Sequence, residues 1–144
     1  MRLVAAVLML TLIGCATTPK PKEPTVVELV TSKDKKTAIA DISKSLIDKG
    51  FTIKSTDHDG GIIVTEPSPF YFKYSFMQIT YPGRSTAQVA VTNDRVKVTI
   101  THECGGMNVV SGSGISFVKC EKSVAVKETS EKEKEFLEAV RSAL

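Results

Sequence analysis

The side chains of this sequence most able to form covalent bonds are its three cysteines, and Cys15 has the most informative surroundings. A single basic residue, Arg2, precedes an apolar run from Leu3 to Ile13, and Gly14 separates that run from Cys15. A short positive segment, a short apolar segment and a small residue are the parts of an export signal that a peptidase removes. Cys15 would be the first residue after such a cut, and its thiolate is the nucleophile nearby that could take a lipid group as a thioether.

The run Leu12-Ile13-Gly14-Cys15 resembles the lipobox of bacterial lipoproteins. This resemblance implies that Cys15 is diacylated, that residues 1–14 are removed as a signal peptide, and that the new amino group is acylated in turn. Membrane lipid would then hold the chain permanently, because two fatty chains already anchor stably and this chain would carry three. Residue 16 is alanine, where an aspartate in enteric-type lipoproteins implies retention in the inner membrane. The implied location is therefore the outer membrane, with the domain facing the periplasm.

Two other interpretations of residues 1–14 are an ordinary secretory signal with an incidental cysteine and a short transmembrane anchor. A membrane span needs about 20 apolar residues, whereas the run from Leu3 to Ile13 has 11. Residues 15–24 place three prolines among polar side chains, which is typical of an extended tether. At about 3 Å per residue, this tether would hold a single domain, residues 25–144, roughly 30 Å from the lipid.

The charge of the chain argues against a nucleic-acid partner. The 19 basic and 16 acidic residues give a formal charge of +3, which becomes +2 when Arg2 leaves with the signal. No long run of one sign is present, whereas nucleic-acid-binding domains carry clustered positive charge. An exported protein would also not meet the genome. We therefore expect membrane lipid and an envelope protein as partners, and no nucleic acid.

Cys104 and Cys120 remain once Cys15 is assigned to lipid, and an exported protein matures under oxidising conditions. A disulfide between them is the natural expectation, and closing a loop of about 15 residues contributes around 3 kcal/mol in the chain-entropy picture. The alternative is a metal or catalytic site at His102, Glu103 and Cys104. Successive strand residues point to opposite faces, so only His102 and Cys104 could converge, and no second cluster completes a ligand set. We expect no metal and no other cofactor.

The elements that must position these side chains are two helices with strands between them. The first helix is expected to start at an N-cap, Ser32, and to end at Gly50 in a left-handed conformation. The second is expected to start with a capping box formed by Ser130 and Glu133. Apolar residues recur at helical spacing in both segments: Ala38, Ile39, Ile42 and Leu46 in the first, and Phe136, Leu137, Val140 and Leu144 in the second.

Alternating apolar and polar residues between the helices predict a mainly antiparallel sheet of five or six strands. Phe51–Lys54 and Ile62–Thr65 flank an acidic, glycine-containing turn and predict a hairpin. Phe70–Tyr81 is expected to form one long strand, with a bulge near Phe76 or Met77 because its apolar residues change from even to odd positions. The other expected features are a strand or packed lead-in at Thr25–Val30, turns at Pro82–Ser85 and Asn93-Asp94, and a last strand at Ile115–Val126. The predicted fold is α+β, with both helices packed on one face of the sheet.

Aromatic and apolar side chains are the better candidates for partner contact. Tyr71 and Lys73 lie on the opposite strand face from the neighbouring phenylalanines, and they would form an accessible patch if no helix covers that face. Met107, Val109 and Val110 stand at the tip of the glycine-rich loop, where they could meet a partner or fold inward.

The two histidines do not predict catalysis. His58 lies in an acidic turn and is most simply solvated, whereas His102 lies on an apolar strand face and is more often a hydrogen-bonded core histidine than a base. The sequence offers no Ser-His-Asp set, phosphate-binding loop or pair of catalytic carboxylates at a convincing spacing. We therefore expect that the protein is not an enzyme.

Residues Thr37–Glu66 carry a second resemblance. A helix, Lys49-Gly50-Phe51, an alternating strand, the turn Asp57–Gly61 and the strand Ile62–Glu66 follow one another. This order is similar to the repeated unit of outer-membrane lipoproteins such as the C component of the β-barrel assembly machinery. The resemblance implies part of a helix-grip domain used for protein contacts.

The leading functional hypothesis is accordingly a lipid-anchored interaction module that holds a protein partner near the outer membrane. Anchoring raises the effective concentration of the domain, so a modest contact affinity would suffice. A second hypothesis is a carrier or sensor of a small ligand, with the aromatic strand lining a pocket between sheet and helix. A third is an inhibitor of an envelope-attacking enzyme, which would present the disulfide-braced loop as a wedge.

Overall fold

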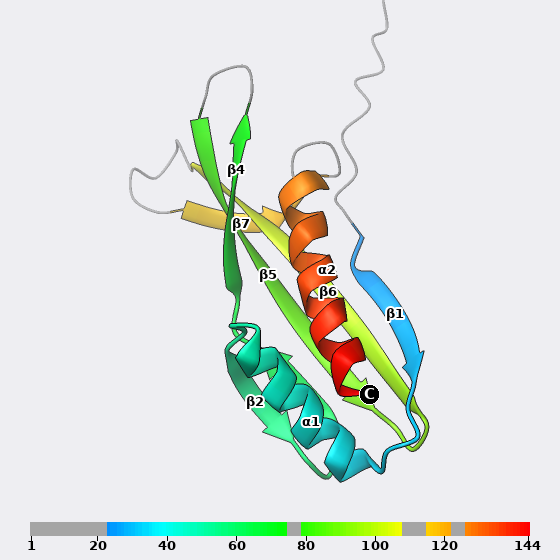
Figure 1. The fold of residues 1–144 in the computed structure, drawn as a ribbon. Coiled ribbons are helices and arrows are strands. Elements are labelled where there is room, and N and C mark those ends of the chain that lie inside the picture. The colour runs from blue at the N-terminus through cyan, green and yellow to red at the C-terminus, as the bar shows by residue number, and fades with distance from the viewer. Residues whose placement is uncertain (1–22, 75–78, 108–114, 122–125) are drawn as a thin grey trace, which may run out of the picture.

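The computed structural model describes residues 23–74, 79–107, 115–121 and 126–144. The elements in chain order are β1 (Thr25–Val30), α1 (Lys35–Asp48), β2 (Ile53–Asp57), β3 (Ile62–Thr65), β4 (Ser68–Tyr74), β5 (Ile79–Val91), β6 (Arg95–Met107), β7 (Ile115–Lys119) and α2 (Val126–Ala143). The α+β prediction is confirmed, and both helices lie on the same side of the sheet (Figure 1). Within the described ranges, no helix combines the length and the apolar character that a membrane span requires.

The sheet is built around one long hairpin, formed by β5 and β6. One half of this hairpin is flanked by β1 on β6 and by β3 and then β2 on β5, in the order β1-β6-β5-β3-β2. The other half is flanked by β4 on β5 and by β7 on β6. The sheet therefore has two ends, one carrying α1 and β2 and the other carrying β4 and β7 (Figure 1).

The main core lies between the helices and the first of these ends. Helical spacing in α1 and α2 brings their apolar stripes onto alternating strand residues, because a strand presents every second residue to one face. The fully buried members are Ala38, Ile39, Ile42, Leu46, Ile63, Val89, Val96, Val98, Ala139 and Val140. Phe51 and Phe136 pack edge to face with ring centroids 5.1 Å apart.

The predicted cap of the first helix is wrong by two residues. Asp34, and not Ser32, is the N-cap of α1, and its carboxylate accepts the backbone N–H groups of Lys36 and Thr37 at 3.1 Å each. A capping side chain must stand directly before the first helical residue, which here is Lys35. The predicted end is confirmed, because Gly50 has a φ of 84° just beyond the helix.

Asp34→Ala should destabilise the fold at neutral pH, and the loss should shrink in acid. The hydrogen bonds from Thr37 and then Lys36 favour the ionised carboxylate and hold the pKa of Asp34 below its ordinary value of 3.8. A lowered pKa in the folded state stabilises the fold above the unfolded pKa and ceases to do so as the pH falls through the folded value. Thermal melts at about pH 7 and about pH 2 would measure this. A destabilisation that is equal at both pH values would contradict the ionised cap.

Phe70–Tyr81 is not one strand. Tyr74 pairs antiparallel with Ile79 and Phe72 with Tyr81, so the run folds back on itself as β4 and the start of β5. The change from even to odd apolar positions therefore arises from a chain reversal and not from the expected bulge. Counting β1, the described sheet has seven strands where five or six were expected.

Three further boundaries differ from the sequence predictions. Pro82–Ser85 is not a turn but lies within β5, paired with β4 and β6. The last strand ends at Lys119, directly before the disulfide-bonded Cys120. α2 begins at Val126, one turn earlier than expected, so Ser130 and Glu133 lie inside the helix and not at its N-terminus. The hairpin of β2 and β3 and the turn between β5 and β6 at Asn93-Asp94 are confirmed.

Candidate interaction surface

The candidate site is a set of side chains on the face of the sheet opposite the helices, at the end that carries β4 and β7. The antiparallel registers arrange this face in rows across four strands. One row contains Tyr71, Pro82, Gly105 and Phe117, and the rows on either side supply Lys73, Ile115 and Arg84. We call the side chains of Tyr71, Lys73, Pro82, Arg84, Ile115 and Phe117 the open-face patch.

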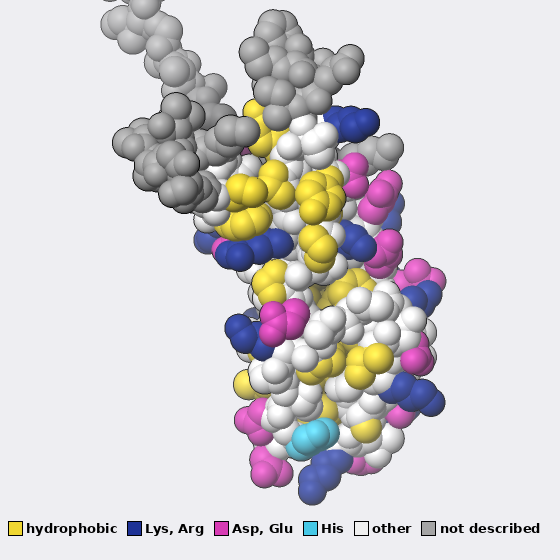
Figure 2. Space-filling view, turned by 90° about the vertical axis from the view of Figure 1, so that its left-hand side faces the viewer, with side chains coloured by type: hydrophobic (Ala, Val, Ile, Leu, Met, Phe, Trp, Pro, Cys, Tyr) yellow, Lys and Arg dark blue, Asp and Glu magenta, His cyan; other side chains and the backbone are white. Residues whose placement is uncertain are grey.

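The open-face patch combines exposed apolar side chains with cations. Tyr71 is 61% exposed and Ile115 is 57% exposed, whereas Phe117 and Pro82 are half-buried. Gly105 lies beneath them, and a Cβ atom there would come within 2.7 Å of Ile115 and 2.8 Å of Pro82, so glycine allows these side chains to close over the strand. Figure 2 shows hydrophobic side chains gathered at this end of the molecule, with Lys and Arg side chains beside them.

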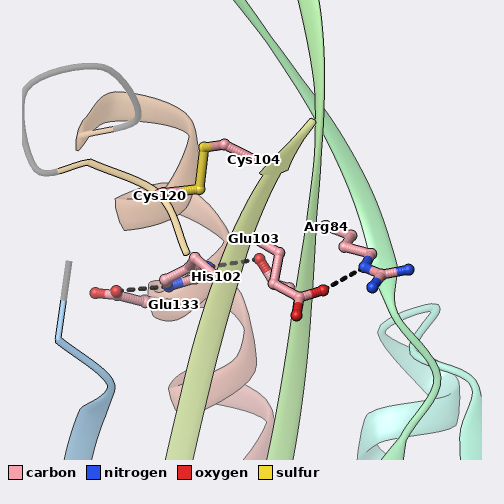
Figure 3. The surroundings of a disulfide bond; sticks show 7 residues. Arg84, His102, Glu103, Cys104, Cys120 and Glu133 are labelled. Carbon is pink, nitrogen blue, oxygen red and sulfur yellow. Dashed lines mark hydrogen bonds and ion pairs between the residues drawn. A yellow bond between two sulfur atoms is a disulfide. The ribbon is translucent and has the colours of Figure 1, made fainter. Parts of the chain in front are cut away.

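Arg84 has a defined orientation within the patch. Its Nε donates to the carboxylate of Glu103 on β6, and its guanidinium carbon lies 4.3 Å from the ring centroid of Phe117. Among the described residues no hydrogen bond or ion pair is made by the two terminal nitrogens, and one of them points away from Glu103 in Figure 3. These two contacts orient the guanidinium, and its terminal nitrogens are left without a partner among the described residues.

The sequence predictions for partner contact meet different outcomes. Tyr71 and Lys73 are exposed on one face as their alternation predicted, and in the described chain both helices pack on the other face. Met107 pairs with Ile115 beside the patch. Val109 and Val110 lie outside the described residues, so the predicted loop-tip contact stays a prediction. Pro82 and Arg84 were missed because Pro82–Ser85 was expected to be a turn.

The disulfide expected between Cys104 and Cys120 is present, with the two Cα atoms 4.8 Å apart (Figure 3). It joins β6 to the residue that follows β7, and thereby braces the strand that carries Ile115 and Phe117. Cys120 is fully buried in a second, smaller core with Phe70 and Phe72. A disulfide inside an apolar cluster adds packing to the constraint on the chain.

A serine, a histidine and a carboxylate meet beside this second core, a set that the sequence analysis did not assemble. The Ser85 hydroxyl lies 2.7 Å from Nδ1 of His102, and Glu133 Oε1 lies 2.7 Å from Nε2 (Figure 3). Thr25 donates to the same Glu133 oxygen at 2.8 Å. A signal for the first pair existed, since Ser85 and His102 stand equally far from the Asn93-Asp94 turn and are therefore cross-strand neighbours.

The geometry of this set favours a structural role. Glu133 and Ser85 each lie at hydrogen-bonding distance from one ring nitrogen of His102, and the tautomer of the ring decides which groups donate. A nucleophilic serine must be reachable by its substrate, whereas Ser85 is only 6% exposed and the His102 side chain 1% exposed. These hydrogen bonds join α2, β1, β5 and β6 across the boundary between the two cores.

A cavity of about 360 Å³ lies beside the disulfide on the helix side of the sheet. Its lining includes the stacked rings of Phe72 and Tyr81, together with Cys104 and Val118. Ligand pockets in proteins begin at about this volume. In the part of the chain that the structure describes, no three His, Cys, Asp or Glu side chains gather as metal ligands would.

Comparisons with known proteins bear on the fold. No protein-family model matches the sequence, and no curated protein matches it. The structure is similar to that of a TBP-like protein from Parabacteroides distasonis ATCC 8503, with a TM-score of 0.53 and 8% sequence identity. The alignment covers 84% of this chain and 94% of that chain. At this identity the similarity concerns the fold alone, and it agrees with the α+β architecture.

Proposed function

We propose that this chain is a lipid-anchored cell-envelope lipoprotein whose domain is a non-enzymatic protein-interaction module at the outer membrane, facing the periplasm. The Leu12-Ile13-Gly14-Cys15 run and the proline-containing tether support the anchor. The open-face patch is the observation that carries the interaction role. Exposed apolar side chains grouped on one face, with cations beside them, are typical of a protein contact site.

The direction of β1 supports a link between the anchor and the patch. Thr25 pairs with Ile100, and β1 runs antiparallel to β6, so the N-terminal end of β1 faces the end of the sheet where Gly105 lies. Cys15 precedes Thr25 by ten residues, and ten extended residues span at most about 35 Å. The open-face patch would therefore be held within reach of proteins embedded in the membrane. Such tethering makes a weak contact effective, because the partner is met at high local concentration.

In-cell photocrosslinking tests the proposal. A photoreactive residue at Tyr71 should give specific protein adducts in intact cells, and these adducts should disappear in the Cys15→Ala variant. Val30 is the matched control, because it is 80% exposed and apolar but lies at the opposite end of the sheet. Equal adducts at both positions, or none at Tyr71 in a well-expressed protein, would contradict an interaction role for the open-face patch.

A small-ligand carrier is the second candidate, because the cavity beside the disulfide has aromatic walls, as that hypothesis requires. It lies on the opposite sheet face from Tyr71 and Lys73, which separates the two roles experimentally. Filling the cavity with Val118→Trp would block a carried ligand and leave the Tyr71 adducts unchanged if the interaction role is correct. The inhibitor hypothesis concerns the segment from Met107 onward, of which residues 108–114 lie outside the described ranges.

A further inference from the structure

We propose that the open-face patch binds an extended, acidic and apolar segment of a partner protein, and that the terminal nitrogens of Arg84 hold a carboxylate of that segment. This inference rests on the proposed function, since it names the chemistry of the partner at the same surface.

Arg84 is the centre of the inference because its guanidinium is oriented before a partner arrives. The Glu103 carboxylate occupies Nε and the Phe117 ring supports one face of the guanidinium, while the fork of terminal nitrogens stays open. A planar fork of two N–H groups matches the two oxygens of a carboxylate. An arginine held in place loses less freedom on binding than a mobile one, so this fork is a better receptor than an isolated surface arginine.

The net charge of the surface favours an acidic partner. In the three rows that the described registers define, Lys73, Arg84 and Lys119 supply three cations and Glu103 supplies one carboxylate. Lys73 lies in the row on one side of Tyr71 and Phe117, and Arg84 and Lys119 lie in the row on the other side. A partner segment that brings an acidic side chain and an apolar side chain would meet both kinds of group at once.

The spacing of the rows favours an extended protein segment over a lipid headgroup. Arg84 and Pro82 are two residues apart on β5, and such neighbours on one strand face are separated by about 6.8 Å. An extended peptide presents every second side chain on one face at the same spacing. An aspartate or glutamate of such a segment would therefore place its carboxylate at Arg84. An aromatic or aliphatic residue two positions away would then lie between Tyr71 and Phe117.

Selection from a displayed library of random peptides against the purified lipidated chain tests this inference. The Arg84→Gln variant serves for counter-selection. Enriched peptides should carry an acidic residue two positions from an apolar one. A synthetic peptide of that kind should bind Arg84→Gln and Arg84→Lys roughly 10- to 100-fold more weakly than the unchanged chain, because both variants lose the charged fork. Lys73→Gln removes a charge from the same patch without touching the fork, and it should weaken binding by less than about fivefold.

Three results would overturn the inference. They are enriched peptides without an acidic residue, full affinity retained by Arg84→Lys, and displacement of the peptide by phosphatidylglycerol vesicles, which would assign the patch to lipid. Thermal melts control for folding, and Arg84→Gln should melt close to the unchanged chain because a partly exposed ion pair contributes little. If Tyr71 gives adducts in cells and any of these three results is also obtained, the proposed interaction function still holds. Only the inference that the partner segment is acidic would then be rejected.

Discussion

Replacing His102 by alanine is expected to lower the free energy of unfolding by about 2–4 kcal/mol. The His102 side chain is 1% exposed and makes hydrogen bonds to Ser85 and Glu133. Its removal would leave a carboxylate that is only 16% exposed without its ring partner and would open a void between the two cores. Urea denaturation followed by circular dichroism at neutral pH measures the difference.

The other histidine provides the control for this experiment. His58 is exposed in the turn between β2 and β3, and His58→Ala should change stability by less than about 0.5 kcal/mol. Glu133→Gln keeps an oxygen that can accept from His102 and Thr25, so it should cost less than His102→Ala. If His102→Ala unfolds at the same urea concentration as His58→Ala, the hydrogen-bonded set does not join α2 to the sheet.

Replacing both Cys104 and Cys120 by serine should lower the free energy of unfolding by about 3 kcal/mol. The two cysteines are 16 residues apart in sequence, and their bond removes conformations of the unfolded chain that the double variant regains. The variant also places serine hydroxyls beside Phe70 and Phe72, where Cys120 is fully buried. Denaturation midpoints with and without a thiol reductant provide the measurement, since reductant should destabilise the unchanged chain and have no effect on the variant.

The same substitution links the disulfide to the open-face patch. β7 carries Ile115 and Phe117, and the disulfide attaches the end of this strand to β6. The double variant should therefore give fewer adducts from Tyr71 in cells, even at temperatures where the domain is still folded. Unchanged adducts would show that the patch does not depend on this brace. Equal denaturation midpoints of the unchanged chain in oxidising and reducing buffer would contradict the predicted stabilisation of about 3 kcal/mol by the disulfide.

Local patterns predicted the parts of this fold whose signals lie within a few residues. The apolar stripe of α1, the glycine that ends it, the β2 and β3 hairpin, and the pairing of Cys104 with Cys120 all follow from short-range spacing or from residue counts. Even the exposure of Tyr71 follows, because side chains alternate along a strand. These features require no knowledge of which strands are neighbours.

The division of Phe70–Tyr81 shows where local reasoning fails. A bulge and a chain reversal both move apolar residues from even to odd positions, and only the pairing of Phe72 with Tyr81 distinguishes them. The turn wrongly predicted at Pro82–Ser85 followed from the same ambiguity. Arg84 was for that reason not predicted as a contact residue. Strand pairing is decided by contacts between distant residues, so the sequence of the strand alone does not contain the answer.

The amino-acid sequence alone was enough to predict an α+β domain, the cysteine pair and one exposed strand face, because periodicity and composition act locally. Tertiary structure alone placed Glu133 against Thr25, 108 residues away, and joined both to His102. It also set Arg84 between Glu103 and Phe117, on three different strands. Such sites arise from the register of neighbouring strands and the packing of a helix on them, and each depends on the free energy of the whole fold.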